Sequence, residues 1–333
     1  MKEKTTKTFF SSFLFAFILL LTANAAQAQK DSVTRTFIPE IDGVIRAKFE
    51  YNSSTGKSRF EVRNARFMVT GYVTKVFNYK AEVDLSDEGQ IKMLDAYVKF
   101  IPLKGLSFTL GQQKIPFSTD NLRSPGTLNF SNRSFIAKRI CKDLRDIGFL
   151  ASYQHDGPFP FAIHAGVLNG SGINTAQWMK MHSFASRLEL GPWKGCSLTA
   201  CYFTGKVGGY NADMFNAGFN YRYKNFFFDM EYAQKHTRDT IGNFHSNGAF
   251  AYALYEIPLK KGILRNIIPA LRYDLYTGDM EKGIIEPSRI TSAVTLGFHK
   301  VSWADIRISY EKYFYKTMPD LDDKATIEFI ARF

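Results

Sequence analysis

The last eight residues, TIEFIARF (326–333), alternate in polarity along their whole length. The apolar parity is Ile327, Phe329, Ala331 and Phe333, and the mostly polar parity is Thr326, Glu328, Ile330 and Arg332. A period of two is typical of a β-strand whose two faces meet different surroundings. Chain ends are usually polar and poorly ordered. An apolar, alternating end therefore predicts that these residues are paired in a sheet and that one face contacts an oily phase.

The same alternation recurs along the chain, and its polar parity is repeatedly charged. In FNYKAEVDL (77–85) the apolar positions alternate with Asn78, Lys80, Glu82 and Asp84. In a lipid-embedded barrel the apolar face contacts acyl chains and the polar face lines a wet lumen. A soluble β-sandwich alternates too. It gives no reason, however, for aromatic strand ends such as Tyr221 and Tyr223, which fit the aromatic girdles of a membrane interface.

The N-terminus predicts export. MKEKTTK is basic, an apolar stretch follows, and Ala26-Gln27-Ala28 is a small-x-small cleavage pattern, as in a secretory signal peptide. We therefore expect a cleaved signal peptide at 1–28, a short lead-in at 29–40 and one barrel domain at 41–333. The rest of the sequence has no apolar run of about 18 residues, which a helical span needs. A closed barrel pairs every main-chain group in lipid without helices, so the predicted location is the outer membrane of a Gram-negative cell.

Charge, cysteines and histidines exclude several other classes. The formal net charge of +12 is dispersed, with no Lys/Arg-rich run, so no nucleic-acid partner is expected. Three cysteines are too few for a disulfide framework, although a pair between Cys196 and Cys201 stays open. The six histidines are scattered without the spacing of a zinc site. We expect no metal, no cofactor and no catalytic residue.

Connection lengths predict an even number of strands. Short connections near 101–105, 155–160, 190–195, 222–225 and 299–303 alternate with longer ones around 116–140, 169–181, 204–213, 236–248 and 277–289. Outer-membrane barrels have short periplasmic turns, longer external loops and an even strand number. The predicted fold class is all-β: a transmembrane antiparallel β-barrel of about sixteen strands.

The longest connection, 116–145, is the third external loop of that barrel. A connection this long is usually functional or disordered. We expect it to fold into the lumen, where its cations would favour anions; a solvated loop that meets lipopolysaccharide phosphates is the alternative. The expected constriction residues are Arg123, Arg133, Lys138, Arg139, Lys142 and Arg145.

Strand parity also predicts which side chains line the barrel wall. The expected lumen residues are Arg46, Lys48, Lys80, Asp95, Lys99, Arg187, Arg222, Arg272 and Arg307. Acids share the same parity, so the wall is close to balanced and a positive bias would come mainly from the loop. The outward Phe333 is expected to act as the C-terminal insertion signal.

Several short motifs, taken in order, resemble the phosphate-selective porin O/P family of outer-membrane porins over the whole mature chain. They are MLDAYVKF (93–100), GQQKIPFS (111–118), NRS (132–134), RDIG (145–148), VLNGSG (167–172), LRYD (271–274) and the terminal Phe. The resemblance implies a sixteen-stranded barrel, commonly trimeric, with an inward third loop, that passes phosphate, polyphosphate or small nutrients. Members depend on a dense ladder of arginines and a lysine cluster, whereas acids are interspersed in the wall here.

The expected function is therefore passive diffusion of small hydrophilic solutes through an outer-membrane porin, with a weak preference for anions such as phosphate. The expected partners are these solutes, lipid and lipopolysaccharide, the barrel assembly machinery, and further copies of the chain in a homotrimer. An occluded barrel that serves as a surface binding or structural component is the main alternative. An outer-membrane hydrolase is disfavoured because no His–Ser pair stands out on an outward parity. A soluble exported β-protein is a further alternative.

Overall fold

The computed structural model describes residues 38–87, 89–142, 144–207, 209–238, 242–280, 283–298, 303–316 and 323–333. The expected signal peptide and most of the expected lead-in lie outside these residues. In the part of the chain that is described, no helix is long and apolar enough to cross a membrane.

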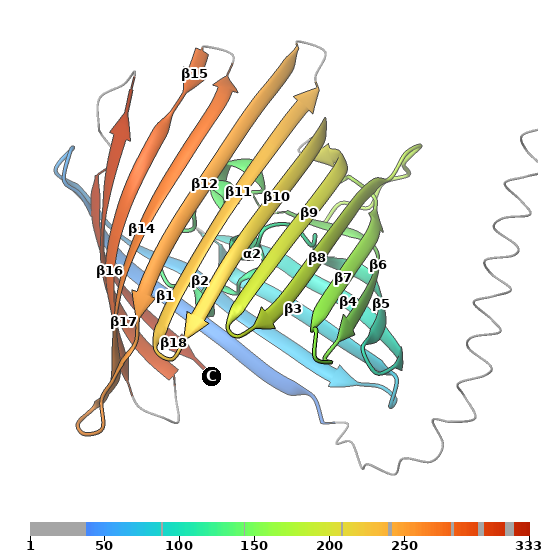
Figure 1. Cartoon of the computed structure of the whole chain (residues 1–333), viewed down its shortest axis with the longest axis horizontal. Coiled ribbons are helices and arrows are strands. Elements are labelled where there is room, and N and C mark those ends of the chain that lie inside the picture. Colours follow the sequence, from blue (N-terminus) through green and yellow to red (C-terminus); the bar gives the residue numbers. More distant parts are fainter. Residues whose placement is uncertain are drawn as a thin grey trace, which may run out of the picture.

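The strands form one antiparallel sheet that closes on itself (Figure 1). They are β1 (Glu40–Asn52), β2 (Lys57–Tyr72), β3 (Phe77–Asp87), β4 (Gln90–Leu103), β5 (Leu106–Lys114), β6 (Arg145–His155), β7 (Phe161–Leu168), β8 (Ser183–Trp193), β9 (Cys196–Val207), β10 (Tyr210–Tyr223), β11 (Phe226–Arg238), β12 (Asn243–Tyr255), β13 (Ile257–Pro258), β14 (Leu264–Met280), β15 (Gly283–Ile285), β16 (Pro287–Phe298), β17 (Trp303–Tyr315) and β18 (Lys324–Arg332). The short β13 and β15 pair with the ends of β14. The other sixteen make the ring, so the predicted strand number is confirmed.

The ring closes where the last strand pairs with the first. Val44 lies opposite Arg332, and the pairing continues to Asn52 opposite Lys324. Beyond the strand, the main chains of Gly43 and Phe333 exchange two hydrogen bonds, of 2.7 and 3.2 Å. The terminal residue is thus paired, as the alternation of TIEFIARF predicted.

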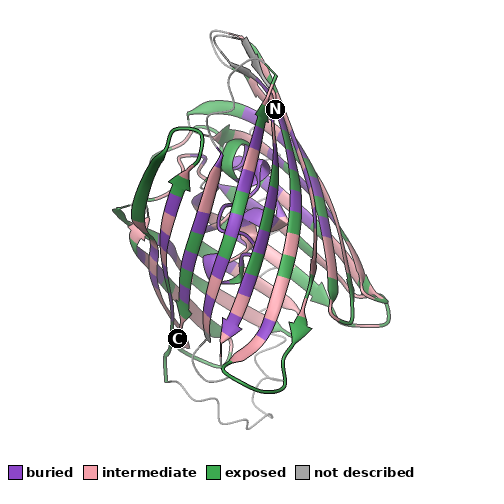
Figure 2. Cartoon of the chain, turned by 90° about the vertical axis from the view of Figure 1, so that its left-hand side faces the viewer, coloured by how far each residue is buried: buried purple, intermediate pink, exposed green. Residues whose placement is uncertain are grey.

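Burial follows the predicted parity. On β18 the outward Phe329 is 58% exposed, whereas the neighbouring Glu328 is completely buried. Buried and exposed positions alternate in the same way along most strands (Figure 2). The polar parity therefore faces the interior of the barrel and the apolar parity faces outward.

Three connections expected to be long are short. β9 and β10 are joined by residues 208 and 209 alone, and β11 and β12 by 239–242. Most of 277–289 also lies in strands, since β14 ends at Met280, β15 spans Gly283–Ile285 and β16 begins at Pro287. The predicted loops at 204–213, 236–248 and 277–289 are therefore wrong. The polar ends of β9 to β11 stay paired because their side chains bond across the sheet: Thr204 donates to Asp213 (2.6 Å), and Arg238 pairs with Asp213 as well. Cys141, Cys196 and Cys201 are all free thiols, so Cys196 and Cys201 do not form a disulfide.

The third loop lies inside the ring (Figure 1). It carries three short helical turns, α2 (Thr119–Leu122), η1 (Pro125–Thr127) and η2 (Ile136–Ile140). Its apolar side chains join a core with inward residues of β7 to β17. Phe130 packs edge-on against Tyr252, and Phe135 lies against Tyr276. Burial of these rings draws the loop to one side of the lumen, and space remains on the opposite side, along β1 to β6.

Candidate functional site: the space between the third loop and the barrel wall

A polar cavity lies between the loop and β1 to β6, and we call it the cationic cavity. Its volume is about 220 Å³. Its charged lining residues are Arg46, Arg63, Arg66, Asp87, Lys114, Arg133, Lys138, Lys142 and Arg145. Eight of these side chains are basic and one is acidic. The lining therefore has a strong excess of positive charge, in contrast to the near balance of the whole wall.

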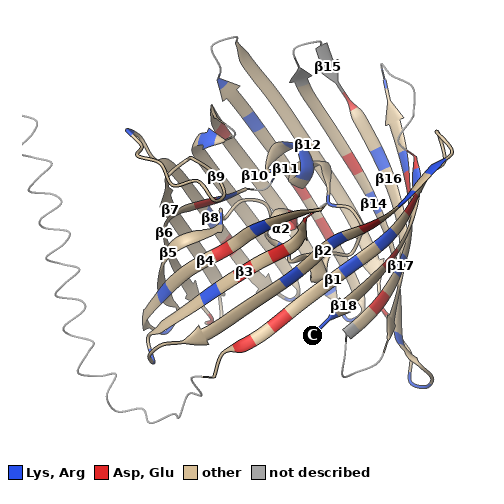
Figure 3. Cartoon of the chain, turned by 180° about the vertical axis from the view of Figure 1, so that it is seen from behind, with Lys and Arg blue, Asp and Glu red and all other residues tan. Residues whose placement is uncertain are grey.

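A second cavity of about 260 Å³ shares Arg66 and Lys114 with the first. Its wall is mixed in charge, because Lys80 contacts Glu82 (2.7 Å) and Asp95 (2.8 Å). Acidic and basic bands alternate on this side of the barrel (Figure 3). The two shared cations lie where the cavities adjoin.

Some cations of the cationic cavity are neutralised by the wall. Arg66 pairs with Asp84 at 2.7 Å, and Arg145 pairs with Asp95 at 2.9 Å. Arg63 pairs with Asp87 at 2.9 Å. These three contribute donors and local structure more than net charge.

Three other cations have no carboxylate within ion-pair distance among the described residues. Lys114 donates to the carbonyls of residues 121, 122 and 123, at 2.8 to 3.1 Å. Arg133 donates to the carbonyls of residues 120 and 123. Within the described part of the chain, the Lys138 ammonium donates one hydrogen bond, to the side-chain oxygen of Asn132 at 3.3 Å. No neighbouring carboxylate of the described residues therefore cancels the positive charge of these three side chains.

The protein environment weakens the charge of two loop cations. Desolvation by the surrounding chain, together with the positive charges of Arg289 and Lys324, outweighs the attraction of Glu311 and lowers the pKa of Lys138 to about 7, although the side chain is accessible from the cavity. Burial and the charges of Arg66 and Arg46 lower the pKa of Arg133 to about 10. A bound anion would counter both effects, since an opposite charge favours the protonated form.

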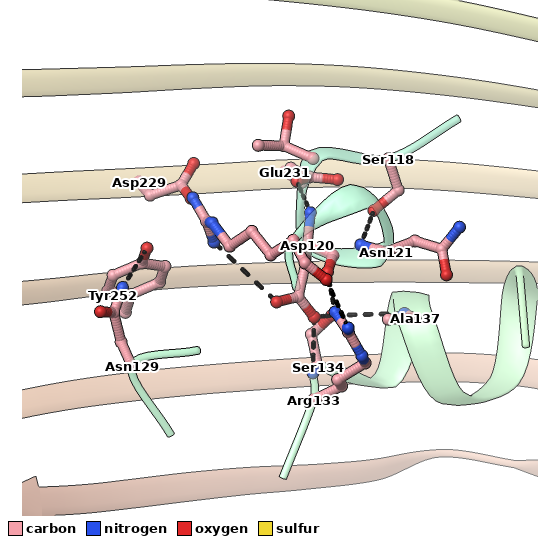
Figure 4. Close-up of polar contacts among 12 residues, drawn as sticks. Ser118, Asp120, Asn121, Asn129, Arg133, Ser134, Ala137, Asp229, Glu231 and Tyr252 are labelled. Carbon is pink, nitrogen blue, oxygen red and sulfur yellow. Dashed lines mark hydrogen bonds and ion pairs between the residues drawn. The ribbon is translucent and has the colours of Figure 1, made fainter. Parts of the chain in front are cut away.

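Asp120 joins the two limbs of the loop to each other and to the wall (Figure 4). Its carboxylate accepts hydrogen bonds from the Ser134 main chain (3.0 Å) and hydroxyl (2.8 Å). Its own N–H donates to Glu231 of β11 at 2.9 Å. Burial alone would raise the pKa of Asp120, but the charges of Arg133 and Arg123 lower it. The carboxylate is thus held ionised at the base of the loop.

The predicted constriction residues divide into two groups. Arg133, Lys138 and Lys142 line the cationic cavity, and so does Arg145, which belongs to β6 and not to the loop. Arg123 instead pairs with Asp229 of β11. Arg139 stacks over the rings of Phe135 (5.3 Å) and Tyr276 (5.1 Å). These last two do not line the cavity, and the role of the others as a constriction stays a prediction.

The predicted wall residues lie on the inward parity but in different surroundings. Arg46, Arg272 and Arg307 are buried beneath the loop, each 2–3% exposed. Lys48 is buried between Glu50 and Glu61. Lys80 and Asp95 line the second cavity. The remaining three lie apart: Lys99 beside Tyr97, Arg187 against Glu189 and the loop residue Thr119, and Arg222 exposed at the end of β10.

Several residues that line the cationic cavity were not predicted from the sequence. Arg63 is the extra residue of a β-bulge, because Arg46 lies opposite Asn64 and Ala47 opposite Val62. A bulge re-aims a side chain, so a strict period of two misplaces it. Lys114 ends β5 within the motif GQQKIPFS, and that motif was the available signal for it.

The first part of the barrel is similar to a known protein family. Residues 41–192 match the family model "phosphate-selective porin O and P". No curated protein matches the sequence.

Solved structures share the fold. An anion-selective porin from Comamonas acidovorans has a TM-score of 0.65 at 13% identity, over 89% of this chain and 98% of that one. A loop-deletion mutant of OmpT, an outer membrane protein of Vibrio cholerae, gives 0.65 at 12% identity, over 89% and 99%. Salmonella typhi OmpF in complex with daunomycin gives 0.61 at 15%, over 89% and 97%. Family and fold together indicate a porin of the outer membrane. Residues 41–192 thus match the phosphate-selective porin O and P family, and the described barrel as a whole has the porin fold.

Proposed function

We propose that the protein lets small hydrophilic solutes diffuse across the outer membrane and prefers anions, phosphate among them. One observation carries this proposal: eight cations and one acid line the cavity between the loop and the wall, and four of the cations (Lys114, Arg133, Lys138 and Lys142) have no carboxylate within ion-pair distance among the described residues. A cleft lined by one sign of charge focuses the field and raises the local concentration of counter-ions. Patches of Arg and Lys set anion preference in pores by the same electrostatics.

The chemistry of the lining suits an oxyanion. Lysine and arginine give charge-assisted hydrogen bonds to phosphate oxygens, and arginine can do so with two parallel donors. Lys138 and Lys142 have exposed side chains in the cationic cavity. The partly filled hydrogen bonding of Lys138 leaves donors for such a solute.

The mixed charge of the second cavity limits the expected selectivity. A solute that leaves the cationic cavity past Arg66 and Lys114 meets Glu82 and Asp95 among the lining residues. Both acids are paired with cations there. We therefore propose a preference for anions and not a strict exclusion of cations.

The expectations about assembly and export stay proposals. The family resemblance supports a homotrimer, contact with lipid and lipopolysaccharide, and insertion by the barrel assembly machinery through Phe333. The basic and apolar leader supports cleavage after Ala28. Family and fold favour a channel over an enzyme.

The test is single-channel recording in a planar bilayer under a salt gradient, with the double variant Lys138→Gln/Lys142→Gln. We expect an anion-shifted reversal potential in the unchanged protein, block by added phosphate, and a shift toward zero in the variant. Arg139→Gln is the matched control, since it removes one charge from the same loop at a side chain that stacks on rings outside the cavity.

Three other results would each change the assignment. Stepwise conductance with no anion preference would leave a general porin. Equal shifts in the variant and in Arg139→Gln would mean that the cationic cavity is not the permeation path. Folded, heat-modifiable protein without conductance would favour the occluded barrel with a binding or structural role.

A further inference from the structure

Five arginines of the barrel wall each donate a hydrogen bond to a main-chain carbonyl of the third loop. The pairs are Arg332 with Gly126 (2.5 Å), Arg307 with Leu128 (2.5 Å), Arg46 with Ser131 (2.8 Å), Arg272 with Asn132 (3.0 Å) and Arg289 with Arg133 (2.9 Å). The acceptors all fall within 126–133. The donors come from β14, β16, β17, β18 and β1, which are successive neighbours in the ring.

Each of these arginines also pairs with a carboxylate of the wall. Glu328 holds both Arg46 and Arg307, the latter at 2.9 Å. Asp274 holds both Arg272 (2.7 Å) and Arg289 (3.0 Å), and Glu311 adds a second partner for Arg289. Arg332 pairs with Asp305 at 2.6 Å. Four carboxylates therefore neutralise most of the positive charge of the five arginines, while the remaining donors reach the loop.

Burial leaves little of these arginines accessible to a solute, although Arg46 also borders the cationic cavity. Four of them are at most 3% exposed, and only Arg332 is partly accessible. The rings of the loop cover two of the guanidinium groups: Phe130 lies 4.4 Å from that of Arg272, and Phe135 lies 4.7 Å from that of Arg289. A group that is covered and ion-paired contributes little to the field in the cationic cavity.

We propose that these five arginines form a clasp that fixes the main chain of residues 126–133 against the wall and so positions the pore. They are positioning residues and not binding sites for solutes. The clasp spans the closure between β1 and β18, so it ties both ends of the barrel sheet to one loop segment. It holds the loop at the edge of the cationic cavity, which Arg46, Leu128 and Ser131 also line, and keeps that cavity open.

The chemistry of the clasp requires arginine. A guanidinium carries five N–H donors in a rigid fork, so it can bind a wall carboxylate and a loop carbonyl at once. Lysine keeps the charge but is a compact point charge without the planar fork. A lysine in place of Arg272 can still neutralise Asp274, whereas the bond to the Asn132 carbonyl is lost.

The test uses charge-conserving substitutions, so that a change in selectivity cannot come from lost charge. The variant is Arg46→Lys/Arg272→Lys/Arg307→Lys, and the control is Arg238→Lys, which changes an arginine paired with a wall carboxylate at the strand end, away from the loop. Two readouts are taken: deuterium uptake of the main chain over residues 124–135, and single-channel conductance. We expect faster uptake and loss of the single stable conductance level in the variant, and neither in the control.

A cross-link separates loop position from other effects of the substitutions. A Cβ on Gly126 would lie 3.4 Å from Cγ2 of Val44. A disulfide in Val44→Cys/Gly126→Cys can therefore join the loop to β1. The partly accessible thiol of Cys196 is removed by Cys196→Ser in the same protein. In the triple variant, the oxidised cross-link is expected to restore slow uptake and stable conductance, and reduction is expected to remove both.

Unchanged deuterium uptake in a folded triple variant would overturn the clasp. So would a conductance change that the oxidised cross-link leaves in place. If the triple variant does not insert, Arg272→Lys alone carries the same uptake measurement, because Arg289 still neutralises Asp274. The conductance measurement rests on the proposed pore function, whereas the deuterium-uptake measurement does not. If the unchanged protein does not conduct, the pore is refuted, and deuterium uptake still tests the clasp.

Discussion

Replacement of Arg289 by Met is expected to destabilise the barrel strongly. Arg289 is completely buried on β16 and bonds Asp274 at 3.0 Å and Glu311 at 2.9 Å. It also donates to the Arg133 carbonyl at 2.9 Å. Methionine fills similar space without any donor, so two buried carboxylates lose their shared partner.

The size of the effect follows from which partners remain. Removal of one member of a buried ion pair typically costs about 3–5 kcal/mol, because it leaves an uncompensated charge. Asp274 keeps Arg272 at 2.7 Å, and Glu311 keeps a hydrogen bond from Asn132 at 3.0 Å. We therefore expect the lower end, a loss of about 3 kcal/mol in the free energy of unfolding.

The assay is denaturant unfolding of the protein in phospholipid vesicles, followed by tryptophan fluorescence. Arg238→Met is the matched control: its ion pair with Asp213 is largely exposed, so we expect a loss of about 0–1 kcal/mol. Adding Glu311→Gln to Arg289→Met should recover part of the lost free energy of unfolding, since the uncompensated charge of Glu311 is then removed. A loss below about 1 kcal/mol for Arg289→Met, equal to that of the control, would refute the view that the loop seals these charges from water.

Three further outcomes are expected. Anion preference should fall as pH rises from about 6 to 8.5, because the pKa of Lys138 is lowered to about 7 and its charge is lost over this range. Reversal potentials of Lys138→Gln should not change with pH in this way. The same pH profile in both proteins would contradict the assignment to Lys138. Gly43→Ala should lower the free energy of unfolding by about 1 kcal/mol, since its Cβ would lie 2.2 Å from the Phe333 ring and the ring must move; unchanged denaturation midpoints would contradict this. Deletion of Phe333 should reduce membrane insertion, because it removes the outward aromatic and its two main-chain bonds to Gly43; quantitative heat-modifiability gels would show full insertion if the residue carries no signal.

Much of the fold was predictable because the two faces of a β-barrel strand require different residue types at alternate positions. A strand whose faces meet lipid and water must alternate with a period of two, and this placed the sixteen strands and the inward parity of residues such as Arg46 and Arg272. Loop lengths were less predictable. The ends of β9 to β12 are polar like loops, yet their main chains stay paired.

The sequence by itself determined which charges point inward, and the tertiary structure decided what those charges do. Arg123 and Arg133 look alike within the loop, but Arg123 pairs with Asp229 on β11 whereas Arg133 lines the cationic cavity. The wall arginines that parity predicted as lumen residues bind loop carbonyls instead. The physical reason is that ion pairs and buried hydrogen bonds join residues far apart in the chain, and only the packing of the loop against one side of the barrel selects those partners.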